Sequence, residues 1–168
     1  MSPRIILIGG IPATGKTTLA KEISINLGVP FFNKDMLEST LIGKNICSIN
    51  ELNGIGYTLM KRIALSELEL GRSVILDCIA PLKRVDKYWN SFKTQDIRYI
   101  ECICSDQKIH RTRLESRKRH IPDWYELTWN DVKNITKSYE PCFETKLNLD
   151  SINPLKDNLE KAIRYVSS

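Results

Sequence analysis

The chain has 168 residues, of which 42% are hydrophobic and 27% are charged, and its mean hydropathy is −0.27. This length is typical of one globular domain, and no apolar stretch approaches the roughly 20 residues that a membrane-spanning helix needs. The five cysteines are odd in number and form no Cys-x-x-Cys pair, which argues against a disulfide framework or a zinc site. No signal-peptide pattern opens the sequence, so we expect one soluble domain over residues 1–168 in the cytoplasm.

The net charge of +5 is concentrated in one segment of the chain. Residues 107–120 contain six lysines and arginines against Glu115 alone, so this segment accounts for the whole net charge. A uniformly basic protein would suggest nucleic acid, whereas one localised basic segment is typical of an anion handled at one place.

The first predicted strand, residues 4–8, leads directly into the loop Gly-Ile-Pro-Ala-Thr-Gly-Lys-Thr, and a helical pattern follows the loop. This order and spacing predict a phosphate-binding loop, whose backbone N–H groups point into one concavity at a helix N-terminus. Lys16 can reach the β- and γ-phosphates, and the Thr17 hydroxyl can ligate Mg²⁺. The predicted nucleotide-binding residues of the loop are Gly10, Ile11, Pro12, Ala13, Thr14, Gly15, Lys16, Thr17 and Thr18.

The second predicted strand, residues 29–32, is followed by Asp35. Catalytic groups of an open parallel sheet gather outside the carboxyl ends of its strands, so this carboxylate is expected near the phosphate loop. It could act as the general base that takes the proton of an acceptor hydroxyl attacking the γ-phosphate. Alternatively, Asp35 could cap a helix, with Glu38 completing a capping box.

Asp77 ends the third predicted strand, residues 73–78. Before it, a capping box from Ser48 to Glu51 predicts the start of a long helix that stops at Gly71. An acid at the end of an apolar strand is typical of a carboxylate near Mg²⁺ in phosphate-loop proteins, so Asp77 and Thr17 are the predicted metal residues. A plain turn-capping role for Asp77 is the alternative.

The basic segment is predicted to form a third helix after the strand at residues 97–104. On a helix, Glu115 lies four residues from both Arg111 and Arg119 and can form ion pairs with them. Arg113 and Arg117 are four apart on one face and have no acidic neighbour at helical spacing. We therefore predict that these two arginines bind the γ-phosphate, against the alternative of a solvated basic face.

The loop at residues 120–125 could close over a substrate, because phosphoryl transfer needs water to be excluded. Trp124, Tyr125 and Trp129 could stack on a substrate ring, although packing is the commoner role of such aromatics. A fifth strand at residues 147–149 and a final helix from Pro154 complete the pattern. Strand-like runs that alternate with helical patterns predict an α/β fold with a parallel sheet.

The chain resembles the P-loop small-molecule and nucleic-acid kinases, the group of polynucleotide kinase, chloramphenicol phosphotransferase, zeta-toxin-like kinases and the shikimate, gluconate and adenylate kinases. The resemblance rests on residues 9–18, Lys34-Asp35, residues 74–77, residues 113–120 and residues 147–151. It implies a three-layer sandwich with a five-stranded parallel sheet of order 2-3-1-4-5, and a short lid around residues 107–126.

The same resemblance implies roles for single residues. Asp35 would contact or deprotonate the acceptor hydroxyl, Arg113 and Arg117 of the lid would clamp the phosphates, and Asp150 and the residues that follow it would lie beside the adenine. Family loops often have glycine where this chain has Ala13. The Asn-Lys-x-Asp guanine signature is absent, which favours ATP as the donor.

We therefore expect a kinase, dependent on ATP and Mg²⁺, that phosphorylates a hydroxyl of a small molecule such as a nucleoside, sugar or antibiotic. We expect the residues between Asp35 and Tyr57 and those at 84–89 to select the acceptor. A polynucleotide 5′-hydroxyl kinase is the alternative, although a strand-binding groove usually has a longer basic track with interleaved aromatics. A nucleotide-dependent switch or toxin-like module that binds ATP without an acceptor is the alternative of another class.

Overall fold

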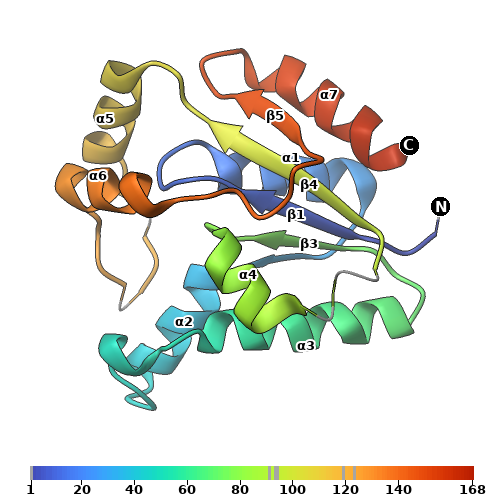
Figure 1. The fold of residues 1–168 in the computed structure, drawn as a ribbon, viewed down its shortest axis with the longest axis horizontal. Helices are drawn as coiled ribbons and strands as arrows, with labels where there is room; N and C mark the ends of the chain where they lie inside the picture. The colour runs from blue at the N-terminus through green and yellow to red at the C-terminus, as the bar shows by residue number, and fades with distance from the viewer. Residues whose placement is uncertain (1, 91, 93–94, 119, 123) are drawn as a thin grey trace.

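The computed structural model describes residues 2–90, 92, 95–118, 120–122 and 124–168. Its five strands form an all-parallel sheet of order β2-β3-β1-β4-β5, which confirms the predicted topology (Figure 1). The strands are β1 (Ile5–Gly9), β2 (Phe31–Asn33), β3 (Val74–Asp77), β4 (Ile97–Ile103) and β5 (Leu147–Asp150).

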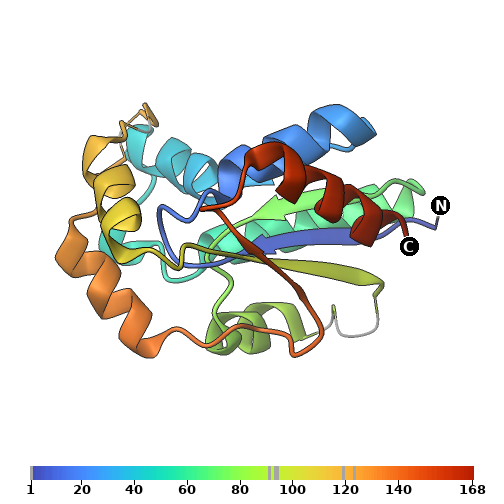
Figure 2. The same cartoon turned by 90° about the horizontal axis from the view of Figure 1, so that it is seen from above.

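Helices cover both faces of the sheet and one of its ends (Figures 1 and 2). One face carries α1 and α7, and the other carries α3 and α4. Helices α2, α5 and α6 lie at the end where the strands terminate. The bounds are α1 (Lys16–Leu27), α2 (Lys34–Gly43), α3 (Ile55–Glu69), α4 (Leu82–Trp89), α5 (Gln107–Ser116), α6 (Trp129–Ser138) and α7 (Leu155–Ser167).

Strand β1 shows why the apolar runs form central strands. Ile5 and Leu7 pack toward α3 and α4, whereas Ile6 and Ile8 pack toward α1 and α7. Successive side chains of a strand point to opposite faces, so a strand covered on both faces must be apolar at every position. The sheet therefore separates two hydrophobic cores, and its carboxyl edge is left to carry the site.

The capping box was correctly identified, but it does not start the long helix. Ser48 caps a short 3₁₀ turn, Ile49–Glu51, and α3 begins only at Ile55. Gly54 lies between them with a φ of 86°, and a Cβ there would meet the ring of Tyr88. The chain needs this left-handed residue to change direction beside the ring, so the prediction of one uninterrupted helix was wrong.

Among the described residues, none of the helices has the length and apolar character that crossing a membrane requires. All five cysteines are free thiols. Cys78, Cys102 and Cys142 are buried, while Cys47 and Cys104 are partly exposed.

The core assignment predicts a large stability difference between two leucines. Leu76 is fully buried in β3, and Leu70 at the end of α3 is 62% exposed. Leu76→Ala should lower the free energy of unfolding by about 3 kcal/mol, because it removes buried methyl groups and leaves a cavity. Leu70→Ala should change it by less than roughly 0.5 kcal/mol. Urea denaturation measures both, and equal losses would contradict the assignment.

Candidate active site

The phosphate loop connects β1 to α1 and has the backbone geometry that its glycines allow. Gly10 has a φ of 127° and Gly15 a φ of 86°. A Cβ on Gly10 would overlap the carbonyl oxygen of Cys102 in β4. Gly15 is the N-cap of α1 and provides no side-chain cap. The first N–H groups of α1 therefore have no capping side chain, and they can bind an anion.

Lys16 lies inside the concavity of this loop. Its side chain is largely buried, and Nζ donates a hydrogen bond of 2.8 Å to the carbonyl oxygen of Ile11. The Thr14 hydroxyl donates to the same oxygen at 2.9 Å. The loop thus holds the ammonium group of Lys16 where the phosphates of a nucleotide would enter.

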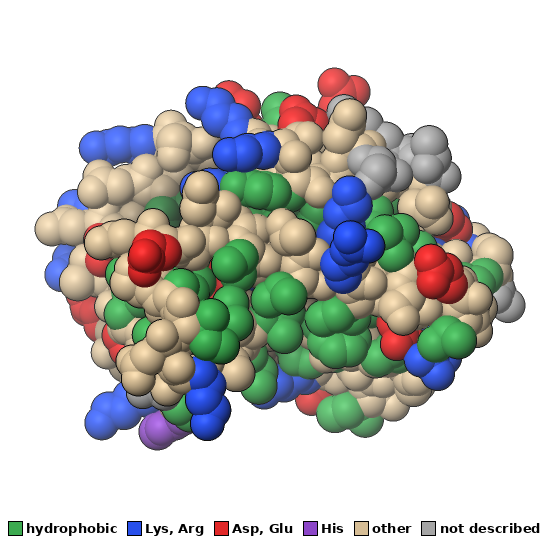
Figure 3. All heavy atoms as spheres, turned by 90° about the horizontal axis from the view of Figure 1, so that it is seen from below, with side chains coloured by type: hydrophobic (Ala, Val, Ile, Leu, Met, Phe, Trp, Pro, Cys, Tyr) green, Lys and Arg blue, Asp and Glu red, His purple; other side chains and the backbone are tan. Residues whose placement is uncertain are grey.

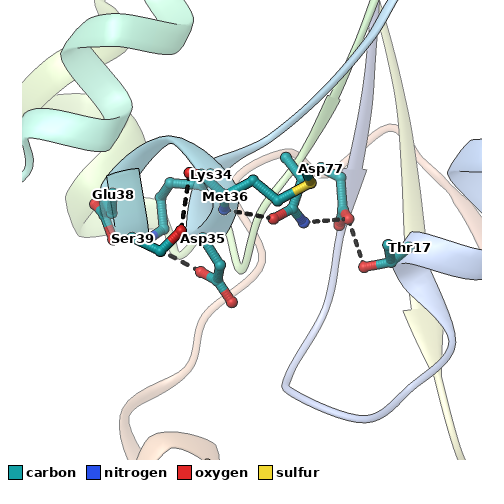
Figure 4. Close-up of polar contacts among 8 residues, drawn as sticks. Thr17, Lys34, Asp35, Met36, Glu38, Ser39 and Asp77 are labelled. Atoms are coloured by element: carbon teal, nitrogen blue, oxygen red, sulfur yellow. Dashed lines mark hydrogen bonds and ion pairs between the residues drawn. The ribbon is translucent and has the colours of Figure 1, made fainter. Parts of the chain in front are cut away.

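Asp77, Thr17 and Asn33 form a hydrogen-bonded group beside the loop (Figure 4). The Thr17 hydroxyl and the Asn33 amide each donate to Oδ2 of Asp77 at 2.6 Å. Asp77 is buried, and this burial raises the pKa of its carboxyl group, although Lys16 and the two hydrogen bonds act in the opposite direction. The second carboxylate oxygen, Oδ1, is buried and has no hydrogen-bond partner in the described part of the chain.

This arrangement fits a magnesium ion. Mg²⁺ prefers oxygen ligands and is usually held by one or two protein oxygens together with phosphates and water. The Thr17 hydroxyl and the unsatisfied oxygen of Asp77 are such groups. A buried carboxylate oxygen without a partner is costly unless a cation or water satisfies it, so these two residues are the candidate metal site.

Asp35 does not cap α2, so that alternative was wrong. The N-cap is Asn33, whose Oδ1 accepts a hydrogen bond of 3.0 Å from the backbone N–H of Met36. Asp35 lies in the first turn of α2 with a side chain that is 30% exposed, and its carboxylate is 3.5 Å from Nζ of Lys34. It lines the same pocket as Lys16 and Asp77, which is the place predicted for an acceptor-side carboxylate.

Glu38 forms a buried ion pair instead of a capping box. Its carboxylate lies 2.6 Å from Nζ of Lys34, which also lies 5.5 Å above the ring of Tyr57. Burial alone would lower the pKa of Lys34. The negative charges of Asp35 and Glu38 raise this pKa by more than burial lowers it, so the net pKa is above the ordinary value. The ammonium group stays charged and neutralises Glu38, which leaves Asp35 as the more exposed carboxylate of α2.

Two pockets meet at the phosphate loop. The first has a volume of about 710 Å³ and lies between the loop and residues 151–155. The second has a volume of about 880 Å³ and lies between the loop, α2 and the described residues of the segment 117–127, which exclude 119 and 123. Lys16, Thr17 and Arg117 line both pockets. Two of the residues predicted to act on phosphates, Lys16 and Arg117, therefore lie at the junction, whereas Arg113 lines only the first pocket, and Asp35 lines only the second.

The structure changes the interpretation of the two arginines. Helix α5 ends at Ser116, and Arg117 has an extended backbone, so Arg113 and Arg117 do not share a helix face. Arg113 also has a protein partner, since its guanidinium donates to Oγ of Ser151 at 2.7 Å and to the Ser151 carbonyl at 2.9 Å. The argument from helical spacing was therefore wrong, although both arginines line the first pocket.

The ion pair predicted on the same helix is present. The Arg111 guanidinium lies 2.7 Å from the carboxylate of Glu115. Its expected counterpart, Arg119, lies outside the described residues.

Asp150 shapes the loop after β5. Its Oδ1 accepts hydrogen bonds from the backbone N–H groups of Ser105 and Ile152, each at 3.2 Å. In this part of the chain, the residues that line the first pocket follow Asp150 and run from Ser151 to Leu155. Asp150 itself does not line the pocket. Its hydrogen bonds instead position the following segment, which is predicted to lie beside the base.

Of the aromatic residues after α5, one packs in a hydrophobic cluster and two line a pocket. Trp129 packs edge-on against His110 at a centroid distance of 5.2 Å and belongs to a small hydrophobic cluster. Trp124 and Tyr125 lie with ring centroids 5.0 Å apart and line the second pocket. The preference for packing holds for Trp129, and the other two rings contribute to the pocket wall.

Several contacts of the site were not found from the sequence. Asn33 joins the N-cap of α2 to Asp77, and its position at the end of an apolar strand just before a helix was the available signal. The contact between Nε2 of His110 and the Pro12 carbonyl, at 2.7 Å, joins residues 98 positions apart. No sequence signal indicated this contact. Residues 84–89 do not line the second pocket, and Trp89 is buried in the core.

Comparison with known proteins gives a likeness of fold. No family model matches the sequence, and a search of the curated proteins finds no match either. A candidate kinase from Chloroflexus aurantiacus has a TM-score of 0.78 at 18% identity, over 98% of this chain and 99% of that chain. A sugar kinase from Janibacter sp. HTCC2649 has a TM-score of 0.72 at 15% identity, over 98% and 95% of the two chains.

The APS kinase of Mycobacterium tuberculosis, solved in complex with AMPPNP and APS, has a TM-score of 0.70 at 15% identity and covers 99% of both chains. These likenesses extend over nearly the whole of each structure. The chain therefore has the P-loop kinase fold, as the motifs implied.

Proposed function

We propose that the protein is a kinase that transfers the γ-phosphoryl group of ATP to a hydroxyl of a small molecule. The observation that carries this proposal is the junction of the two pockets, where Lys16, Thr17 and Arg117 lie between a nucleotide-sized cavity and a second cavity that contains Asp35. A protein that only binds a nucleotide has no need of a second cavity of this size with a carboxylate at the phosphate end.

The first pocket is the proposed ATP site. Its phosphate end is formed by the loop and the uncapped start of α1, and the segment from Ser151 to Leu155 is proposed to contact the base. Thr17 and Asp77 are the proposed residues for Mg²⁺, which neutralises charge on the phosphate oxygens when it is bound. The APS kinase relative in complex with AMPPNP supports an ATP-like donor.

The second pocket is the proposed acceptor site. Asp35 is proposed to orient the acceptor hydroxyl and to take its proton as the oxygen attacks the γ-phosphorus atom. Lys16 and Arg117 donate hydrogen bonds to the phosphate oxygens and stabilise the negative charge spread over them in the transition state. The segment 117–127 forms one wall of this pocket and is proposed to exclude water, which would otherwise compete with the acceptor.

A radiolabelled ATP assay tests the proposal. The protein is incubated with [γ-³²P]ATP, Mg²⁺ and a panel of nucleosides, nucleotides, sugars and aminoglycoside or phenicol antibiotics, and labelled product is separated from free phosphate. Transfer to at least one alcohol at a rate above ATP hydrolysis is the expected result. Hydrolysis alone, with no acceptor labelled, would favour the nucleotide-dependent switch.

The two arginines should affect different steps. Arg117 lies at the junction of the pockets, so Arg117→Ala should lower kcat by about 10- to 100-fold and change the affinity for ATP little. Arg113 is bonded to Ser151 at the proposed base segment, so Arg113→Ala should mainly weaken ATP binding. Steady-state kinetics and calorimetric titration with a non-hydrolysable ATP analogue separate the two effects. A loss of ATP affinity with unchanged kcat in Arg117→Ala would contradict its proposed role.

A further inference from the structure

We propose that the acceptor is a nucleotide, that is, an alcohol that carries a planar base and a phosphate group. This inference rests on the proposed function, because it concerns the same second pocket. Three properties of the pocket carry it: its length along α2, the apolar and aromatic side chains on its walls, and lysines that have no ion-pair or hydrogen-bond partner for the ammonium group among the described residues.

The pocket extends along α2 beyond the turn that holds Asp35. Met36, Thr40 and Lys44 follow one another at i, i+4 and i+8, and all three line the pocket with exposed side chains. At 1.5 Å per residue, this stripe covers about 12 Å of the helix. In Figure 4, Asp35 and Met36 leave the first turn of α2 toward the space that also faces Thr17 and Asp77. The pocket therefore accommodates a molecule longer than one sugar ring, with its hydroxyl near Asp35.

The walls of the pocket offer flat, apolar surfaces. Met36 is 55% exposed on one wall, and Trp124 and Tyr125 lie on the wall formed by the segment 117–127. Aromatic rings stack on planar bases, and a methionine thioether packs readily against ring systems. A nucleobase presents a planar aromatic face on which such side chains can stack.

The charge of the pocket changes along its length. Lys44 on α2 and Lys118 on the opposite wall are exposed, and within the described residues neither ammonium group forms an ion pair or hydrogen bond. Glu38 is neutralised by Lys34, and the carboxylates of Asp35 and Asp77 lie at the phosphate end of the pocket. Two lysines without acidic partners favour a phosphate, and a neutral alcohol would leave both without a ligand.

The face of the molecule seen from below carries both hydrophobic and basic side chains (Figure 3). Figure 3 views the molecule from the side of α3 and the connection between α2 and α3. Hydrophobic side chains gather near the middle of this face, and lysine or arginine side chains flank a histidine at its lower left edge. Free nucleoside monophosphates and the 5′-hydroxyl end of an oligonucleotide share the required chemistry, and the experiment below distinguishes them.

The first test compares acceptors in matched sets. Each set contains a nucleoside, its 3′- and 5′-monophosphates and a 5′-hydroxyl oligonucleotide of four residues, beside ribose as a neutral sugar. The expected result is a kcat/KM at least about tenfold higher for the phosphorylated compounds than for the nucleoside or ribose. A higher value for the oligonucleotide would identify a nucleic-acid end, and a higher value for a monophosphate would identify a free nucleotide. Equal or higher values for the neutral compounds would overturn the inference.

The second test uses variants with a matched control. Lys44→Gln and Lys118→Gln should each raise the KM for the phosphorylated acceptor about tenfold, or roughly 1.4 kcal/mol, and leave the KM for the parent nucleoside unchanged. Lys161→Gln, on the exposed side of α7 and outside both pockets, should change neither value. Lys44 is also the C-cap of α2, so melting temperatures check that its loss does not act through helix stability. Equal effects on phosphorylated and neutral acceptors would contradict the proposal.

A third measurement separates failure of this inference from failure of the kinase assignment. Calorimetric titration without ATP measures binding of the nucleoside monophosphates, the oligonucleotide and ribose directly. Binding of a phosphorylated compound that is weakened by Lys44→Gln, with no transfer from ATP, would support the ligand class and reject the kinase. Transfer to neutral sugars alone would support the kinase and reject the ligand class. If no nucleotide binds and none is phosphorylated, the ligand class is also rejected.

Discussion

Replacing Lys16 with alanine should abolish phosphoryl transfer while the protein stays folded. The ammonium group lies in the concavity of the phosphate loop, where it can stabilise charge on the β- and γ-phosphates. Removal of such an electrostatic contact from a dehydrated site typically lowers kcat by about 100-fold or more. The side chain belongs to none of the three hydrophobic clusters, and alanine is a good helix former at the first position of α1.

The experiment measures transfer of label from ATP, with circular dichroism to confirm the fold. Lys161→Ala on α7 is the control for loss of a lysine outside both pockets, and it should behave like the unmodified protein. Turnover of Lys16→Ala within about tenfold of the unmodified protein, or roughly 1.4 kcal/mol in the barrier, would contradict the phosphate-loop assignment.

Asp35→Asn is expected to lower transfer by roughly two to four orders of magnitude at saturating acceptor. Asparagine keeps the size of the side chain but cannot take the proton of the attacking hydroxyl. Since Asn33 is the N-cap of α2, the substitution leaves the cap in place. It removes one charge from the first turn, which alters stability by at most about 1 kcal/mol. The affinity for ATP and the melting temperature should therefore change little.

Asp157→Asn is the matched control for this substitution. Asp157 is also an acid in the first turn of a helix, α7, but it is exposed and lies outside both pockets. It should reproduce the small effect on stability without any loss of transfer. Unchanged transfer in Asp35→Asn would reject the general base and direct attention to Asp77. A loss of ATP affinity instead would place Asp35 at the metal.

The parts of the molecule that local sequence patterns determine were predicted correctly. The five strand-like runs became the five strands, and β1, which is buried on both faces, is apolar throughout. The phosphate loop was identified from Gly10 and Gly15, which both have positive φ angles, and at Gly10 a Cβ would also meet the backbone of Cys102. The strand order came from the resemblance to the P-loop kinases, and the structure confirms it.

The errors arose where contacts between distant segments override local pattern. Helical spacing suggested that Arg113 and Arg117 share a face, but α5 ends at Ser116 and Arg113 turns to Ser151, which is 38 residues away. Glu38 has the spacing of a capping box, yet burial beside Lys34 makes an ion pair the better solution. In both cases the tertiary fold determines which partner the side chain has or how far it is buried. A local sequence motif carries no information about either.

The small hydrophobic cluster beneath α5 and α6 also sets a rule for building chimeras. Ala13 of the phosphate loop packs there with Leu114 and Val132, and the Pro12 carbonyl contacts His110. The tip of the loop and the α5–α6 segment should therefore be replaced together in a chimera. Grafting residues 107–135 from a relative onto this chain without residues 11–13 would pair two surfaces that were never fitted to each other. A recombination library with both segments exchanged together should yield more folded members than one with either segment exchanged alone.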